Sequence, residues 1–300
     1  MMIACLFAEF KASERVASHN TLYHGRVRKM TLRMLSIACG ISLCAAMGAR
    51  ADTIAVNFET YPTGPIVNGY DGWQITNPAW DQAVVSSGAI SGTQSWRMSR
   101  LLASGSFGDQ PFSPALAELA GEVTPNKLFT ASWVMQATTV TAVTGDGLSI
   151  AMDNGTGARG NQIRVVGASG AWQIIVDDYD GTAFTTTSLG TLSSTIATKI
   201  SWSMLFVPGA DNDVWKVSVD DVLVYTGIGW EEYFRDFQPG ISPVSYDRLL
   251  FRAGGPSIAG ATGILIDDIT YSSIPEPATI ALMTLGLAGL GALRRRRTAV

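Results

Sequence analysis

Residues 215–225 read WKVSVDDVLVY and predict a β-hairpin. Trp215, Val217 and Val219 alternate with polar residues, and a second apolar run follows from Val222 to Tyr225. A period of two is typical of a strand with one buried face. Asp-Asp at 220–221 fits a two-residue turn, because Asp tolerates positive φ. We therefore expect two antiparallel strands joined at this turn.

The same alternation extends outward over most of the chain. It is clearest in the runs 54–58, 129–135, 148–152, 172–176 and 202–206. Turn-forming clusters at 153–157, 167–170 and 208–213 separate these runs. The pattern predicts about a dozen short antiparallel strands, a core that includes Trp133, Trp172, Trp202 and Trp215, and one short helix over Pro114 to Leu119.

Three further stretches carry a resemblance to a known fold. They are Asn57-Phe58-Glu59, Gly69-Tyr70-Asp71-Gly72-Trp73 and the closing run 263–271. Together with the hairpin, they resemble concanavalin A-like or laminin-G-like jelly rolls, although Asp-Gly is more usual at the hairpin turn in that family. The resemblance implies an all-β fold, a single antiparallel jelly-roll β-sandwich over 52–273, with its first and last strands side by side.

The N-terminal region has the proportions of a signal peptide. A short basic segment from Met30 leads into the uncharged stretch 35–48, and Ala49-Arg50-Ala51 has the small-x-small form of a signal peptidase site. We predict a signal peptide over 30–51 with cleavage after Ala51. Residues 1–29 are then a probable non-native extension, with Met30 or Met34 as the true start. The alternative, an uncleaved anchor over 35–48, is short for a membrane span.

The C-terminal region, 274–300, has three parts in a fixed order. Pro275-Glu276-Pro277 precedes an uncharged run over 278–293, and four arginines follow: Arg294, Arg295, Arg296 and Arg297. As a helix, the run would be about 24 Å long, slightly less than the ~30 Å hydrocarbon layer. It predicts a marginal transmembrane helix whose arginine end stays in the cytoplasm. A plain membrane anchor and a buried core helix are the alternatives.

This three-part order resembles the PEP-CTERM sorting signal of Gram-negative bacteria that produce exopolysaccharide. The resemblance implies that an exosortase, a membrane-embedded cysteine protease-transpeptidase, processes the precursor near Pro275-Glu276-Pro277. The protein would pass through the inner membrane and reach the cell surface or extracellular matrix. Exosortase, the inner membrane and extracellular polysaccharide are the partners that this reading implies.

The composition of the exported body restricts its chemistry. All cysteines and histidines of the chain precede the predicted cut: Cys5, His19, His24, Cys39 and Cys44. The body therefore lacks the bases of Ser-His-Asp or Cys-His catalysis, the usual zinc ligands, and disulfides. Residues 52–273 hold 10 Lys and Arg against 22 Asp and Glu, a net charge of −12. This charge argues against nucleic acid as a partner.

Carboxylate chemistry remains possible, as in glycosidases. The densest carboxylate and aromatic segment is Trp230-Glu231-Glu232-Tyr233. However, adjacent residues of a strand point to opposite faces, and the Glu-x-Asp-x-x-Glu motif of laminarinase-type jelly rolls is missing from the sequence. Residues 250–254 faintly resemble an alginate-lyase motif but lack its tyrosine. We expect a non-enzymatic body. A secreted carboxylate-dependent polysaccharide hydrolase or lyase is the alternative.

Carbohydrate binding is the function that the body's aromatic residues favour. Tyr70, Trp80, Trp230 and Tyr233 fall in predicted loops or strand ends, where an exposed ring could stack on a sugar. Core packing or loop anchoring is the competing interpretation for all four.

Calcium is the ion that an acidic body without histidine could accept, because it takes carboxylate and carbonyl oxygens. If the first and last strands are neighbours, Glu59 could share a structural calcium site with Asp267 or Asp268. Two turns hold further candidates: Asp177, Asp178 and Asp180 in one, and Asp211 and Asp213 in the other. Solvated turns are the alternative for each set.

Overall fold

The predicted hairpin is present in the computed structural model of the protein. β12 (Val214–Val219) and β13 (Val222–Gly227) pair antiparallel across Asp220 and Asp221, whose φ angles are 48° and 64°. Both turn residues are left-handed, as a type I′ turn requires. Asp220 also ties the turn to the neighbouring strand, because its carboxylate accepts a hydrogen bond from the Lys199 amide at 2.9 Å.

The structure describes residues 52–76, 80–103, 110–116, 128–207, 212–230, 233 and 246–274. All of them belong to one compact unit spanning 49–279. They form fifteen strands and one 3-10 turn, η1 (Tyr70–Gly72), and these residues contain no α-helix. The fold of the described residues is therefore all-β, as the alternation predicted.

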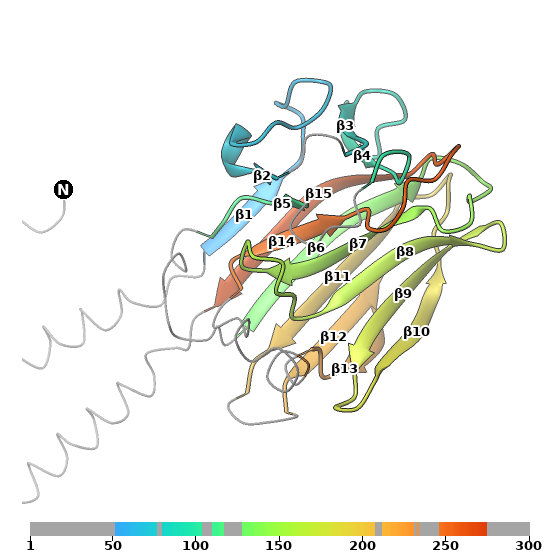
Figure 1. Ribbon diagram of the computed structural model, residues 1–300. Coiled ribbons are helices and arrows are strands. Elements are labelled where there is room, and N and C mark those ends of the chain that lie inside the picture. Colours follow the sequence, from blue (N-terminus) through green and yellow to red (C-terminus); the bar gives the residue numbers. More distant parts are fainter. Residues whose placement is uncertain are drawn as a thin grey trace, which may run out of the picture. The chain divides into compact units, whose positions relative to one another are not determined.

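The strands form two antiparallel sheets stacked face to face (Figure 1). In the first sheet the order is β13-β12-β11-β6-β15-β4-β3, and β1 also pairs with β15. In the second sheet the order is β10-β9-β8-β7-β14-β5-β2. The remaining bounds are β1 Asp52–Val56, β2 Gln74–Ile75, β3 Gln82–Val85, β4 Ser95–Met98, β5 Pro111–Phe112, β6 Leu128–Ala137, β7 Gly147–Asp153, β8 Gln162–Ala168, β9 Ala171–Tyr179, β10 Phe184–Thr191, β11 Thr198–Leu205, β14 Arg248–Arg252 and β15 Ile264–Ile274.

The last strand, β15, lies inside the first sheet and pairs along both of its edges. β15 pairs with β6 along its length, while its other edge takes β4 at Ile264–Ile266 and then β1 at Ile269–Ser273. The register shifts at Asp267–Asp268, and Asp268 has a φ of 48°, as expected at a β-bulge. The prediction that the first and last strands lie side by side is thus confirmed.

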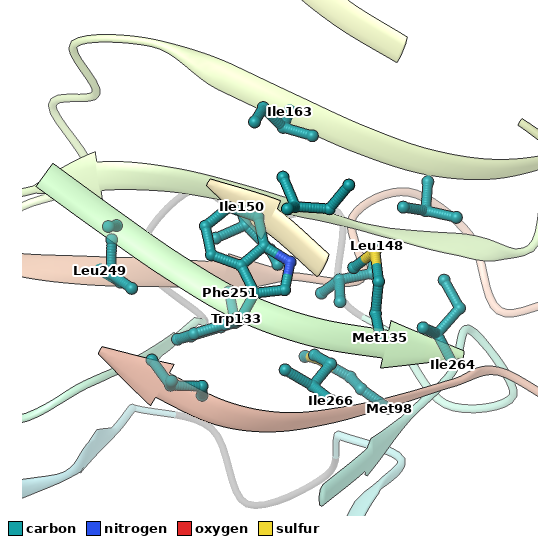
Figure 2. Close-up of a cluster of buried hydrophobic side chains, with 14 of the residues drawn as sticks. Met98, Trp133, Met135, Leu148, Ile150, Ile163, Leu249, Phe251, Ile264 and Ile266 are labelled. Carbon is teal, nitrogen blue, oxygen red and sulfur yellow. The ribbon is translucent and has the colours of Figure 1, made fainter. Parts of the chain in front are cut away.

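The core lies between the two sheets. Figure 2 shows Trp133 and Met135 of β6 among side chains of β7, β14 and β15, including Ile150, Phe251 and Ile266. All four tryptophans that the sequence assigned to the core are buried. Replacing a buried tryptophan by alanine typically costs about 3–5 kcal/mol, so these side chains are major contributors to stability.

Several sequence predictions fall partly or wholly outside the described residues. The signal peptide over 30–51, the extension 1–29 and the sorting region from Pro275 onward lie outside them, as does the predicted transmembrane helix over 278–293. Within the described residues, no helix is long and apolar enough to cross a membrane. Of the short helix predicted from Pro114, the described part to Leu116 is not helical, because the Leu116 amide donates to the Asp247 carbonyl instead.

The hairpin turn gives a test of the fold. Asp221→Gly should raise the free energy of unfolding by about 0.5 kcal/mol, because glycine adopts positive φ without the steric cost of a β-carbon. The substitution also removes the exposed Lys199–Asp221 ion pair, which is worth at most about 1 kcal/mol and typically less. Asp221→Ala loses the same ion pair but keeps the β-carbon, so it should be less stable than the glycine variant in chemical denaturation. The reverse order would contradict the turn geometry.

Candidate functional site

The outer face of the second sheet carries polar and aromatic side chains. Along β9, Trp172, Ile174 and Val176 point into the core, so Asp177 and Tyr179 point outward. Asp177 pairs in register with Gln162 of β8 and Thr186 of β10, and Tyr179 pairs with Phe184 of β10. We call this surface the outer face.

An aromatic cluster lies at one end of the outer face and consists of Tyr179, Phe184, Trp230 and Tyr233. The Phe184 ring centroid is 4.8 Å from that of Trp230, 4.9 Å from Tyr233 and 5.1 Å from Tyr179. Phe184 is 45% exposed and Tyr233 is half-buried, whereas Trp230 is buried. Aromatic pairs at such distances contribute about 0.5–1.5 kcal/mol each. The cluster is therefore a fixed apolar surface with one side open to solvent.

Two adjacent aspartates hold Trp230 in this cluster. The Trp230 indole Nε1 donates to the Asp177 carbonyl at 2.9 Å, and its backbone amide donates to the Gly160 carbonyl at 2.8 Å. Asp178 points to the other side of β9, where its carboxylate accepts bonds from the Tyr225 hydroxyl at 2.7 Å and the Ile228 amide at 3.0 Å. Burial raises the pKa of Asp178. Asp178 thus fixes the segment that leads to Trp230.

Charged side chains adjoin the aromatic cluster. Asp177 forms a two-point ion pair with Arg164, at 2.5 Å to Nε and 2.6 Å to Nη2, and also accepts a bond from the Thr186 hydroxyl at 2.7 Å. The Arg159 guanidinium lies 5.1 Å from the Trp230 ring centroid, within the range of a cation–π contact. Arg159 and Asp177 are each only 7% exposed, so the aromatic cluster is bordered by charged groups that are largely buried.

Asp153 is a buried carboxyl at the end of β7. Its Oδ1 accepts bonds from the amides of Gly155, Thr156 and Gly157 at 2.7, 3.1 and 3.0 Å, while its buried Oδ2 accepts no hydrogen bond. Burial raises the pKa of Asp153 to about 6, although these amide bonds oppose the shift. The carboxyl therefore titrates in a range where surface aspartates are fully ionised.

The four aromatic residues predicted to stack on sugars do not lie together. Trp230 and Tyr233 belong to the aromatic cluster, but Trp80 and Tyr70 pack against the main core. Trp80 is only 4% exposed, because it continues the inward alternation of Gln82 and Val84 in β3. Its prediction as an exposed loop ring is therefore wrong. Trp230, at 5% exposed, is likewise buried, because Phe184 and Arg159 pack against its ring.

Two of the predicted calcium ligands, Glu59 and Asp267, accept hydrogen bonds from residues 93–95. Glu59 accepts bonds from the Thr93 amide and hydroxyl at 2.9 and 2.6 Å, which lower its pKa. Asp267, from the last strand, accepts a bond from the Ser95 hydroxyl at 2.7 Å. Asp268 is exposed at the bulge. Calcium here stays a prediction.

The other acidic turns have local structural roles. Asp180 accepts bonds from Thr182 and Ala183, and Asp213 accepts a bond from the Val207 amide. Asp211, Glu231 and Glu232 lie outside the described residues. In the part of the chain that the structure describes, no three His, Cys, Asp or Glu side chains are arranged to hold a metal ion.

Most residues of the aromatic cluster and of its charged border were not predicted from the sequence. Tyr179, Phe184, Arg159 and Arg164 were not singled out, although the alternation along residues 171–179 places Asp177 and Tyr179 opposite the core residues. Strand pairing was the missing information, because it brings Phe184 beside Tyr179. The sequence does not give the order of the strands in the sheet.

Comparison with known proteins identifies the C-terminal region. Residues 273–297 match the model of the PEP-CTERM protein-sorting motif. The match begins within β15, so the motif starts where the sheet ends. No curated protein matches the chain.

Several solved structures are similar to this chain at low sequence identity. The T. cruzi calreticulin globular domain has a TM-score of 0.43 at 9% identity, covering 81% of this chain and 94% of that one. The catalytic domain of the Coprinopsis cinerea glycoside hydrolase family 131 protein has a TM-score of 0.40 at 10% identity, and the match covers 74% of this chain and 97% of that domain. Cellulose induced protein, Cip1, has a TM-score of 0.38 at 16% identity, and the match covers 73% of this chain and 96% of that one. Such scores support no functional inference.

Asp153 gives a pH-dependent test of the site. A folded-state pKa of about 6, against about 3.9 unfolded, means that the folded protein binds more protons between these values. The contribution of Asp153 to the free energy of unfolding is therefore greatest below pH ~4. It falls by about 2–3 kcal/mol as the pH rises through ~6. Asp153→Asn should remove this fall in denaturation measured from pH 4 to 7.

Asp180→Asn is the matched control, because Asp180 is exposed and hydrogen bonds lower its pKa. Unfolding curves for the Asp153 variant and wild type that keep a constant separation across this pH range would show that Asp153 is not the titrating group.

Proposed function

We propose that the protein is exported, sorted by exosortase through its PEP-CTERM motif, and presented at the cell surface or in the extracellular matrix. The match over 273–297 supports this proposal. Two structural facts are consistent with processing at both ends of the body. β1 begins at Asp52, the residue that follows the predicted cut, and Asp52 pairs with Ser273, just before Pro275. Both cuts would therefore leave the sandwich intact.

We further propose that the body is a concanavalin A-like, non-catalytic module that binds polysaccharide through the outer face. The single observation that carries this proposal is the aromatic cluster, in which exposed Phe184 and half-buried Tyr233 sit beside Arg159 and Asp177. An apolar ring surface bordered by fixed polar groups suits a sugar, whose ring has apolar faces and hydroxyl edges. Trp230 supports the surface from beneath.

A hydrolase or lyase that uses carboxylates is the second candidate. Asp177 and Asp178 are adjacent but face opposite sides of β9, and each already holds other side chains or amides. Glu231 and Glu232 follow Trp230 directly in the sequence. Turnover that is abolished by Glu231→Gln or Glu232→Gln would establish this candidate in place of simple binding.

The sorting proposal predicts both termini of the mature protein. Intact mass spectrometry of protein from the native host should find a chain that begins at Asp52 and has lost the arginines at 294–297. Replacing these four arginines by glutamine should make the unprocessed form accumulate, because the cationic end no longer fixes the helix orientation. A mature wild-type chain that still ends at Val300 would indicate a permanent anchor instead.

The binding proposal predicts loss of affinity when the exposed rings are removed. On a glycan array, Phe184→Ala and Tyr233→Ala should each weaken binding of the recognised polysaccharide by about five- to tenfold, equivalent to roughly 1–1.4 kcal/mol of ring contact. Leu223→Ala is the matched control, because Leu223 is 55% exposed on β13 of the other sheet. Equal losses in all three variants would argue against the outer face.

The same array separates the remaining alternatives. Repeating it with EDTA tests calcium, because chelation should weaken binding only if the ion stabilises the site. Assays for released reducing sugar and for unsaturated product, run in parallel, test catalysis. We expect neither product.

A further inference from the structure

One end of the sandwich exposes aliphatic side chains on three loops. Val140 and Ile196 are 80% and 70% exposed, and Leu101 and Leu102 are exposed as well. A single exposed aliphatic residue is ordinary, but several of them gathered at one place mark a contact surface. We call these four residues and the loops that carry them the apolar end.

The strand register brings the three loops together. Ile264, at the start of β15, pairs with both Met98 of β4 and Ala137 of β6. The loops that follow β4 and β6 therefore leave the first sheet at the same end. The loop before β11 joins them, because Thr198 of β11 pairs with Met135 near the end of β6. In Figure 1 this end of β6 lies away from the start of β1.

Hydrogen bonds to one buried residue hold the two most exposed side chains in place. The Trp172 indole Nε1 donates to the Thr139 carbonyl at 3.1 Å, next to Val140. The Trp172 carbonyl accepts a bond from the Leu192 amide at 2.9 Å, in the loop that carries Ile196. Both loops are therefore fixed to the core at Trp172, and their aliphatic side chains are presented side by side.

The loops at this end carry no charge, although the body is strongly acidic. The neighbouring loops 168–171 and 256–263 are hydrogen-bonded to the loop of Val140. No Asp, Glu, Lys or Arg occurs in any of these segments, which are 101–103, 138–145, 168–171, 192–198 and 256–263. Arg100 borders them and donates to two of their backbone carbonyls, and the exposed Lys199–Asp221 ion pair stands beside the start of β11. A body with a net charge of −12 thus has one end whose loops add nothing to its negative potential.

A lipid bilayer suits this end better than a protein partner does. The cores of protein interfaces are enriched in aromatic residues, methionine and arginine, whereas the exposed side chains here are leucine, valine and isoleucine. Aliphatic side chains among serine and threonine can enter the boundary between headgroups and acyl chains while the hydroxyls stay solvated. The net negative charge favours zwitterionic over anionic lipids.

We propose that the apolar end docks on a bilayer of zwitterionic phospholipid, with Val140 and Ile196 entering its interface. The sorting region leaves from the other end of the body, because β15 runs from Ile264 at the apolar end to Ile274. Eleven strand residues span roughly 35 Å. The two ends can therefore be engaged independently. This inference does not depend on saccharide binding.

The test uses the full chain and two populations of vesicles. The chain is reconstituted in bead-bound phosphatidylcholine vesicles, its loading is quantified, and the capture of free fluorescent phosphatidylcholine vesicles is measured. The wild type should capture the free vesicles. The double variant Val140→Ser/Ile196→Ser should weaken capture at least about tenfold, because hydroxyls replace the aliphatic groups that enter the interface. Its unfolding curve should match that of the wild type, since both side chains are exposed.

Val224→Ser is the matched control, because Val224 is exposed on β13 and lies outside the loops of the apolar end. It should leave capture unchanged. Anionic phosphatidylglycerol in the free vesicles should weaken capture, and salt should restore it, because the body is acidic. Stronger capture of anionic vesicles would point to the arginines at 294–297 and overturn the inference. Equal capture by the wild type and the double variant would also overturn it, and capture of neither vesicle type would refute the lipid partner.

Discussion

The sandwich depends on the hydrogen-bonded edges of β15. Along one edge this strand pairs with β6, and along the other it pairs first with β4 and then with β1. The change of partner occurs at the Asp267–Asp268 bulge, where one extra residue lets the strand bend. The Asp267 carboxylate stabilises this point by accepting a bond from Ser95, the first residue of β4. The ends of the body thus meet in one sheet, and the sorting motif starts at its margin.

The candidate site depends on the two-residue period of β9. Asp177 and Asp178 are neighbours in sequence, yet one faces the outer surface and the other faces the segment after β13. Asp177 holds Arg164, Thr186 and the Trp230 indole, while Asp178 holds Tyr225 and the Ile228 amide. The core residues Val176 and Ile174 fix the strand between these contacts. The packing of the sandwich is therefore what positions the aromatic cluster.

The net negative charge of the body suits the proposed extracellular location. A net charge of −12 keeps the body soluble and repels anionic surfaces over the length of electrostatic screening, about 8–10 Å. This charge would help a protein with the proposed extracellular location to remain dispersed among acidic polymers.

The sequence by itself determined the all-β class, the Asp220–Asp221 hairpin and the sorting motif. Each is encoded locally: alternation reports which face of a strand is buried, a turn needs two residues that tolerate positive φ, and the motif is a contiguous segment. The pairing of the first and last strands followed from the resemblance to jelly rolls. The aromatic cluster required the tertiary structure, because Tyr179, Phe184, Trp230 and Tyr233 come from separate segments. Trp80 differs, since its burial follows from the β3 alternation once that pattern is extended backward to residue 80. The meeting of distant side chains depends on strand order, which no local pattern specifies.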